Sequence, residues 1–147
     1  MLCCAVALLA GVGAGCQKAL VQRLEEVSHE DGTYRGVFID QDEIQVGIEF
    51  SLHDNRVTRI GFRHLRAKGD EYLNAEEGSR EARLGDEYKK LIAHLEGKDI
   101  RKHLTDLYEP ERIAGDLPLD GLTAATVRSS KMISSIRDAL MRGVYSY

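Results

Sequence analysis

The amino-acid sequence predicts a single α+β domain in which an antiparallel β-sheet packs against helices. Segments between residues 31 and 65 alternate apolar and polar side chains, as half-buried strands do. Segments after residue 86 instead repeat apolar side chains at helical spacing. Strands that come before the helices, rather than between them, favour an antiparallel sheet, and 147 residues suit one domain.

The first two strands are expected at residues 31–40 and 45–52. The first segment opens with a turn and then alternates, and the second alternates more regularly. In the second, one face carries Val46, Ile48 and Phe50, and the other carries Gly47, Glu49 and Ser51. This period of two predicts that only one face of the sheet is buried.

A hairpin is expected to follow, with Asp54 and Asn55 at the centre of a turn over residues 53–56. The returning strand is predicted at residues 56–65. One of its faces is expected to hold Thr58, Ile60, Phe62 and His64. Three successive strands of this kind form an antiparallel meander, whose apolar face needs a covering layer.

The covering layer is predicted to come from helices in the second half of the chain. Residues 66–83 are charged and contain glycines, which indicates a loop with one helical turn. Helices are expected at 86–96, at 99–108 and from Ser129 to Met141, with a turn-rich segment at 109–118. The apolar stripes are Tyr88, Leu91, Ile92 and Leu95; Ile100, Leu104 and Leu107; and Met132, Ile133, Ile136 and Leu140. Gly97 and Gly143 are expected to end the first and last of these helices.

The N-terminal residues 1–16 differ from the rest because they carry no charged side chain. This run is too short to cross a bilayer, but it has the length of the apolar part of a signal peptide. It ends in small residues before Cys16, and so resembles a bacterial lipoprotein signal in which that cysteine is lipidated. We therefore expect a signal at 1–16, a linker or short helix at 17–30, and the domain at 31–147, outside the cytoplasm and anchored to the membrane through lipid.

An alternative for the N-terminus is the opening of a dinucleotide-binding fold, with a strand, a glycine turn and a helix. Gly11 and Gly13 fit the G-x-G-x-x-G pattern, but Cys16 occupies the third glycine position. The alternation of strands and helices that such a sheet requires does not follow.

Composition and histidine spacing narrow the classes of function. The net charge of −4 gives no indication of a nucleic-acid partner. The five histidines lack the spacing of a metal site, so no metal is expected. His64, Tyr34, Tyr72 and Tyr88 are candidates to contact an aromatic cofactor, with a surface role for the histidine and a packing role for the tyrosines as the alternatives.

The segment DGLTAAT, residues 120–126, precedes the last predicted helix. Free backbone N–H groups and the positive end of the helix dipole gather at such a position and suit a phosphate. The small Ala124 and Ala125 allow a bulky group to approach the backbone, and the hydroxyl of Thr126 is suited to hold a phosphate or to carry one covalently. The alternative is that the hydroxyl only caps the helix.

Two segments together resemble the FMN-binding domain of the flavin subunits of Rnf and of the sodium-translocating NADH:quinone reductase, which recurs in membrane-anchored bacterial flavoproteins. The first is DGTYRGVF with IQVGIEFSLHDNRVTRIGF, and the second is DGLTAATVRSS with the helix after it. In the family's motif, an aspartate is followed by two variable residues, Ser or Thr, usually Gly, and Ala-Thr. Asp120, Thr123, Ala125 and Thr126 match in register, and Ala124 stands where glycine is usual.

The resemblance implies that FMN is joined to Thr126 through a phosphoester that a separate flavin transferase makes from FAD. Asp120, Thr123, Ala124, Ala125 and Ser129 are then the neighbouring cofactor-binding positions. The function implied is electron transfer between membrane or extracellular redox partners, without a catalytic acid–base pair.

Two other functions remain open from the sequence. The first is a module with this fold that carries no covalent flavin and acts through protein interactions. The second is an enzyme that binds FMN reversibly and reduces a small substrate. The colour of the protein before and after denaturation distinguishes the three functions.

Overall fold

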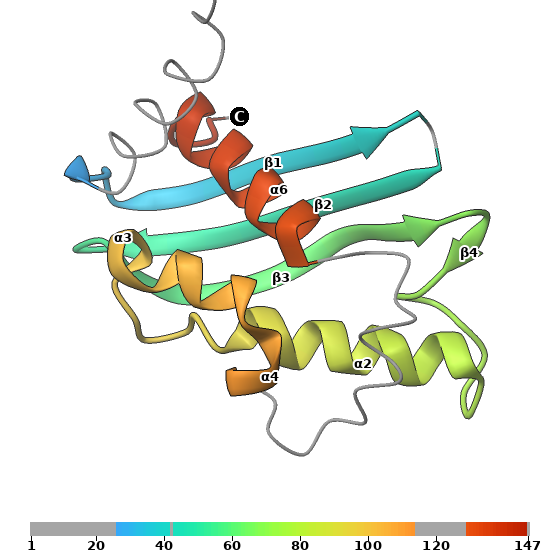
Figure 1. Ribbon diagram of the computed structural model, residues 1–147. Helices are drawn as coiled ribbons and strands as arrows, with labels where there is room; N and C mark the ends of the chain where they lie inside the picture. Colours follow the sequence, from blue (N-terminus) through green and yellow to red (C-terminus); the bar gives the residue numbers. More distant parts are fainter. Residues whose placement is uncertain (1–25, 42, 114–128, 147) are drawn as a thin grey trace, which may run out of the picture.

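The computed structural model describes residues 26–41, 43–113 and 129–146 (Figure 1). It confirms an α+β arrangement in which one antiparallel sheet packs against helices. The strand order is β1-β2-β3-β4, so each strand pairs with its neighbour in sequence. The strands are β1 (Gly32–Asp40), β2 (Ile44–His53), β3 (Arg56–Ala67) and β4 (Asp70–Glu71).

The hairpin between β2 and β3 turns at the two expected residues. Asp54 and Asn55 have φ values of 50° and 60°, which a two-residue hairpin turn of the mirror-image type requires. Asn55 is buried, and its Oδ1 accepts a hydrogen bond of 2.7 Å from the backbone N–H of His29. The turn therefore also fixes the end of the predicted linker 17–30, of which residues 17–25 lie outside the described part.

The prediction that Thr58, Ile60, Phe62 and His64 share one face of β3 was wrong for two of the four residues. The buried or half-buried inward side chains are Val57, Ile60, Phe62, Leu65 and Ala67, while Thr58 and His64 are exposed. The pairing with β2 shifts register twice, and it leaves Thr58 and Arg63 without a partner. Each extra residue is a β-bulge, which reverses the alternation for the residues that follow.

The expected loop at 66–83 is in part regular structure. β3 continues to Ala67, and a turn at Lys68 and Gly69, with φ values of 51° and 87°, leads into the short β4. At the other end, α2 (Arg80–Ala93) begins before the predicted residue 86. Ser79 starts this helix, because its hydroxyl accepts a hydrogen bond of 3.1 Å from the backbone N–H of Ala82.

The remaining helices lie close to their predicted positions. The segment predicted at 99–108 is divided into α3 (Ile100–His103) and the 3₁₀ helix η1 (Leu104–Tyr108). The segment predicted as turn-rich begins with one helical turn, α4 (Pro110–Ile113), and residues 114–118 lie outside the described part. The last helix, α6 (Ser129–Arg142), ends at Gly143, whose φ of 83° suits a helix C-terminus.

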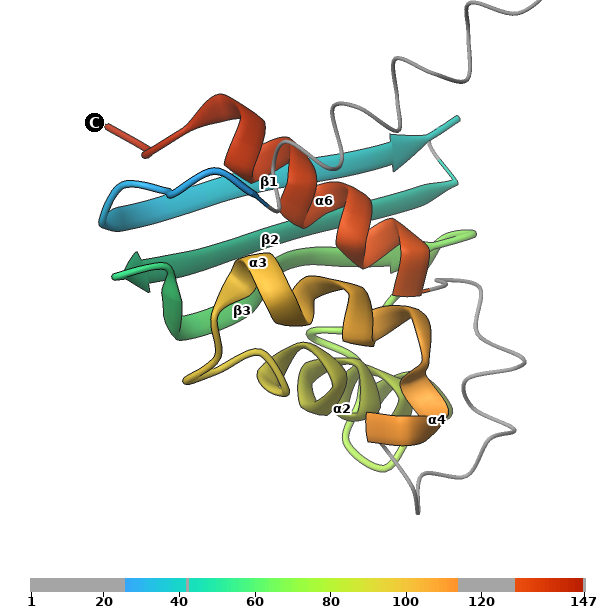
Figure 2. The same cartoon turned by 60° about the vertical axis from the view of Figure 1, so that its left-hand side comes forward.

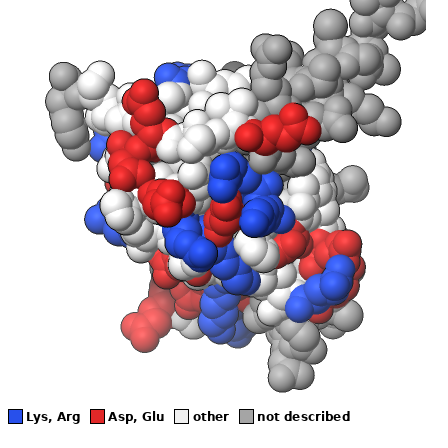
Figure 3. All heavy atoms as spheres, turned by 90° about the vertical axis from the view of Figure 1, so that its left-hand side faces the viewer, with Lys and Arg blue, Asp and Glu red and all other residues white. Residues whose placement is uncertain are grey.

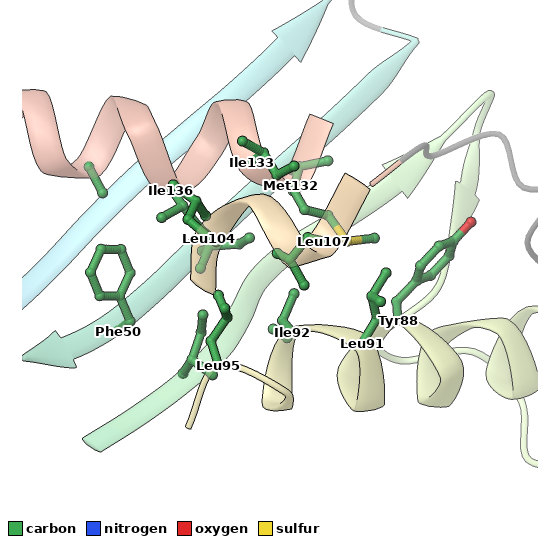
Figure 4. Packing of buried hydrophobic residues seen from close by; sticks show 14 of the residues in the cluster. Phe50, Tyr88, Leu91, Ile92, Leu95, Leu104, Leu107, Met132, Ile133 and Ile136 are labelled. Carbon is green, nitrogen blue, oxygen red and sulfur yellow. The ribbon is translucent and has the colours of Figure 1, made fainter. Parts of the chain in front are cut away.

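The core lies between one face of the sheet and the helices. α6 crosses β1 and β2, while α2 lies beside β3 (Figures 1 and 2). Side chains of α2, η1 and α6 converge on the sheet (Figure 4). All the residues of the three predicted helical stripes are buried, as expected. The other face of the sheet has no helix from the described residues over it.

Candidate functional site

The predicted attachment segment borders the N-terminus of α6. Asp120, Thr123, Ala124, Ala125 and Thr126 lie outside the described residues. Ser129 is the first residue of α6, as predicted, and is half-buried. Thr126 thus precedes, by three positions in the sequence, a helix of 14 residues. Such a helix start gathers N–H groups that lack an intrahelical acceptor, together with the positive end of the dipole.

Lys131 adds a cation to the first turn of α6. Its Nζ lies 3.4 Å from Oδ2 of Asp40, at the end of β1, and 4.4 Å from the centre of the Phe38 ring. The sequence interpretation did not include this residue. Its position in the sequence could have indicated an anion nearby, because a lysine in the first turn of a helix is unfavourable beside the positive end of the dipole. The pair places one positive and one negative side chain close to the start of the helix.

A second group of polar side chains lies where α2 meets η1. Oδ2 of Asp106 is 3.0 Å from Nε2 of His94 and 2.9 Å from Nδ1 of His103. Nζ of Lys98 lies 2.9 Å from Nδ1 and 2.8 Å from Nε2 of the same His94 ring. The hydrogen bond from His94, followed by that from His103, lowers the pKa of the Asp106 carboxyl. His94 and Asp106 line a cavity of about 430 Å³, and Tyr108 is another of its lining residues.

The contact between His94 and Asp106 joins the C-terminal end of α2 to η1, so this polar group has a structural explanation. Within the part of the chain that the structure describes, no set of three or more His, Cys, Asp or Glu side chains is arranged to hold a metal ion.

The three tyrosine candidates belong to the core. Tyr34 stacks on Phe50, with ring centres 5.3 Å apart, and its hydroxyl donates a hydrogen bond of 2.7 Å to the carbonyl of Glu30. Tyr72 and Tyr88 meet edge to face with ring centres 5.8 Å apart. All three are buried, which confirms the packing role. His64 is exposed on the open face of the sheet, as its alternative role predicts.

Charges at the end of the molecule that carries the β2–β3 turn and α3 form a mixed network. Figure 3 shows basic side chains gathered there around acidic ones. Arg101 pairs with Asp99 at 2.7 Å, and Arg56 donates a hydrogen bond of 3.1 Å to the carbonyl of Gly97. The first contact lies within α3 and its cap, and the second joins the start of β3 to the segment before α3, so this network has a structural explanation.

Comparisons with protein-family models, with curated proteins and with solved structures gave no match to this chain. The family resemblance therefore depends on the quoted motif residues. Among the described helices, none has both the length and the apolar character needed to cross a membrane. The predicted signal at 1–16, with Cys16 at its end, lies outside the described residues.

Proposed function

We propose that this protein is an electron-transfer flavoprotein that works outside the cytoplasm and carries FMN on Thr126 through a phosphoester. The observation that carries the proposal is the place of DGLTAAT in the chain, three residues before the start of a long helix at Ser129. A phosphate at this position benefits from the free N–H groups and from the dipole of α6. The domain is small and contains a buried core, which suits a carrier that holds its cofactor in place and leaves the redox chemistry to the cofactor.

The described residues at the helix start suit the phosphate of the flavin. Ser129 offers a hydroxyl, and Lys131 offers a positive charge in the same turn. Asp40 stays close to Lys131 and keeps the ammonium group oriented from the side of β1. When bound, FMN supplies the exchange of electrons, while the protein holds the phosphate and sets the environment of the ring.

The attachment reaction is a transfer of the FMN half of FAD. The Thr126 oxygen forms a bond to the phosphorus of the FMN half, the bond between the two phosphates of FAD breaks, and AMP leaves. The hydroxyl proton is released. The product gains the mass of FMN less one water, and no oxidant or reductant is consumed.

Intact mass under denaturing conditions tests the proposal most directly. The chain is co-expressed with a flavin transferase, beside Thr126→Val and Ser129→Ala variants. We expect the gain in the wild type and in Ser129→Ala, because that serine is not the attachment point, and no gain in Thr126→Val.

The other outcomes identify the alternatives. Yellow protein that loses its colour on denaturation, without a mass gain, indicates reversible FMN binding. Colourless, unmodified protein, made beside a transferase that modifies another substrate, contradicts the proposal and leaves the interaction module.

A further inference from the structure

A hollow of about 460 Å³ lies on the open face of the sheet, beside the C-terminal end of α6. It is lined by residues of β1, β2 and β3 and by the residues that follow α6. α6 has 14 residues, so its two ends are about 20 Å apart at the helical rise of about 1.5 Å per residue. The hollow is therefore well separated from the start of α6, and its volume falls within the range of small-molecule sites, about 300–1,000 Å³.

Arginines from three separate elements line this open-face hollow: Arg35 from β1, Arg63 from β3 and Arg142 from α6. Arg35 and Arg63 share one carboxylate, Glu49, at 2.6 and 3.3 Å, and Arg59 contacts the same group at 3.3 Å. The hydrogen bond from Arg35 is the main cause that lowers the pKa of Glu49. Among the described residues, three arginines gather around this one carboxylate, so this part of the sheet is rich in basic groups.

Asp138 is a second carboxylate close to these cations, and it is already engaged. Its Oδ2 accepts a hydrogen bond of 2.9 Å from the backbone N–H of Val37 and another of 2.9 Å from Nε of Arg142. Among the described residues, Glu49 and Asp138 each have several partners.

The hollow also has a defined floor and wall. At the floor, Gly47 has no side chain, and the ring of His64 lies so close that a Cβ on the glycine would be 2.8 Å from Cδ2. The wall is Tyr145, whose backbone N–H donates a hydrogen bond of 2.7 Å to the carbonyl of Thr33. The centre of its ring lies 3.9 Å from the Arg35 guanidinium carbon. Val37 and Val144 add exposed apolar surface.

We propose that the open-face hollow binds a small organic anion, with a carboxylate or phosphate group on an apolar or flat body. The planar fork of arginine matches both anionic groups through paired hydrogen bonds. Val37, Val144 and the Tyr145 ring contact the body. This site is independent of the flavin at Thr126, and binding at the hollow does not require that the proposed function be correct.

A titration followed by amide chemical shifts tests the site. The ¹⁵N-labelled Thr126→Val chain, which cannot carry flavin on that residue, is titrated separately with benzoate, phenyl phosphate and inorganic phosphate. We expect saturable shifts at Gly47, His64 and Tyr145 with benzoate, phenyl phosphate or both. The tighter of the two identifies the preferred anionic group. Equal affinity for inorganic phosphate would show binding of an adventitious ion only and would overturn the proposal.

A matched pair of variants shows whether the lining arginines carry the affinity. Arg63→Gln with Arg142→Gln is expected to weaken binding at least about tenfold, because charge-assisted hydrogen bonds are lost. The two side chains are 42% and 62% exposed, so the fold tolerates the change. Lys89→Gln with Lys102→Gln removes the same charge elsewhere and is expected to keep the affinity. An equal loss in both variants, or no saturation up to about 10 mM, overturns the proposal.

Discussion

Gly36 sets the distance between the sheet and the last helix. It lies within β1, opposite Ile48, and is buried under α6. A Cβ at this position would overlap the carbonyl oxygen of Ser135 and crowd the backbone of Ala139. The buried Ser135 hydroxyl donates a hydrogen bond of 2.9 Å to the Gly36 carbonyl. Glycine weakens a strand, so its presence at this position reflects the close approach of α6.

Replacement of Gly36 by alanine is expected to lower the free energy of unfolding by at least about 2 kcal/mol, because the overlapping atoms belong to the helix backbone and cannot rotate away. Urea unfolding followed by circular dichroism measures this loss. Gly61→Ala is the control: a Cβ there meets no heavy atom within 4 Å, so we expect a change within about 0.5 kcal/mol. Equal losses in the two variants would contradict the role given to Gly36.

At the scale of the elements, α3 depends on a capping residue that is also paired. Oδ1 of Asp99 accepts a hydrogen bond of 3.0 Å from the backbone N–H of Arg101, which caps the helix. The same carboxylate accepts hydrogen bonds of 2.9 and 2.7 Å from the Arg101 guanidinium. Side-chain hydrogen bonds from Arg101 are the main reason that the pKa of Asp99 falls from 3.8 to about 2.

The lowered pKa predicts how the stability conferred by Asp99 depends on pH. The folded state favours the ionised carboxylate, so the contribution is complete well above pH 3.8 and is lost as the pH falls through about 2. Asp99→Asn keeps a capping oxygen but removes the charge. We expect this variant to be less stable than the wild type at pH 7, with a difference that disappears between about pH 4 and pH 2.

Unfolding by urea at a series of pH values measures this difference. Asp86→Asn is a suitable control, because Asp86 is 67% exposed and its pair with Lys89 is a surface contact. A difference between wild type and Asp99→Asn that stays constant down to pH 2 would contradict the argument.

The elements also show what the sequence could predict and what it could not. α2 and α6 were predictable because one side of each packs on the sheet, which forces apolar residues into stripes. The bulges at Thr58 and Arg63 depend on the register with β2, which the alternation in β3 alone does not determine. The sequence did predict the helix start at Ser129. The contact of Lys131 with Asp40 could not be predicted, because it joins residues 91 positions apart and depends on how α6 packs on β1.

For the whole molecule, the first strand and the last helix form a single packed unit. α6 contacts β1 and β2, and its buried side chains join those of α2 and η1 in one core. α4, in contrast, has no buried residue. Cooperative stability is therefore expected to be greatest where α6 meets the sheet and least at α4.

Native-state hydrogen exchange measures this distribution. We expect amides in the middle of α6, and those shared by β1 and β2, to exchange only through global unfolding, because opening them uncovers the core. Amides of α4 are expected to exchange through local opening, with a smaller dependence on urea. Amides on the exposed side of α6, compared with those on its buried side, serve as a control for solvent access. Uniform protection across α4 and α6 would contradict this picture.

The hydrogen bond between Val37 and Asp138 joins residues 101 positions apart. Bringing two such distant segments together has a cost in chain entropy that only the finished core offsets. During synthesis from the N-terminus, β1 and β2 emerge early and their apolar face stays uncovered until α6 has left the ribosome. The part of the core between β1, β2 and α6 can therefore be completed only once α6 is available to pack on these strands.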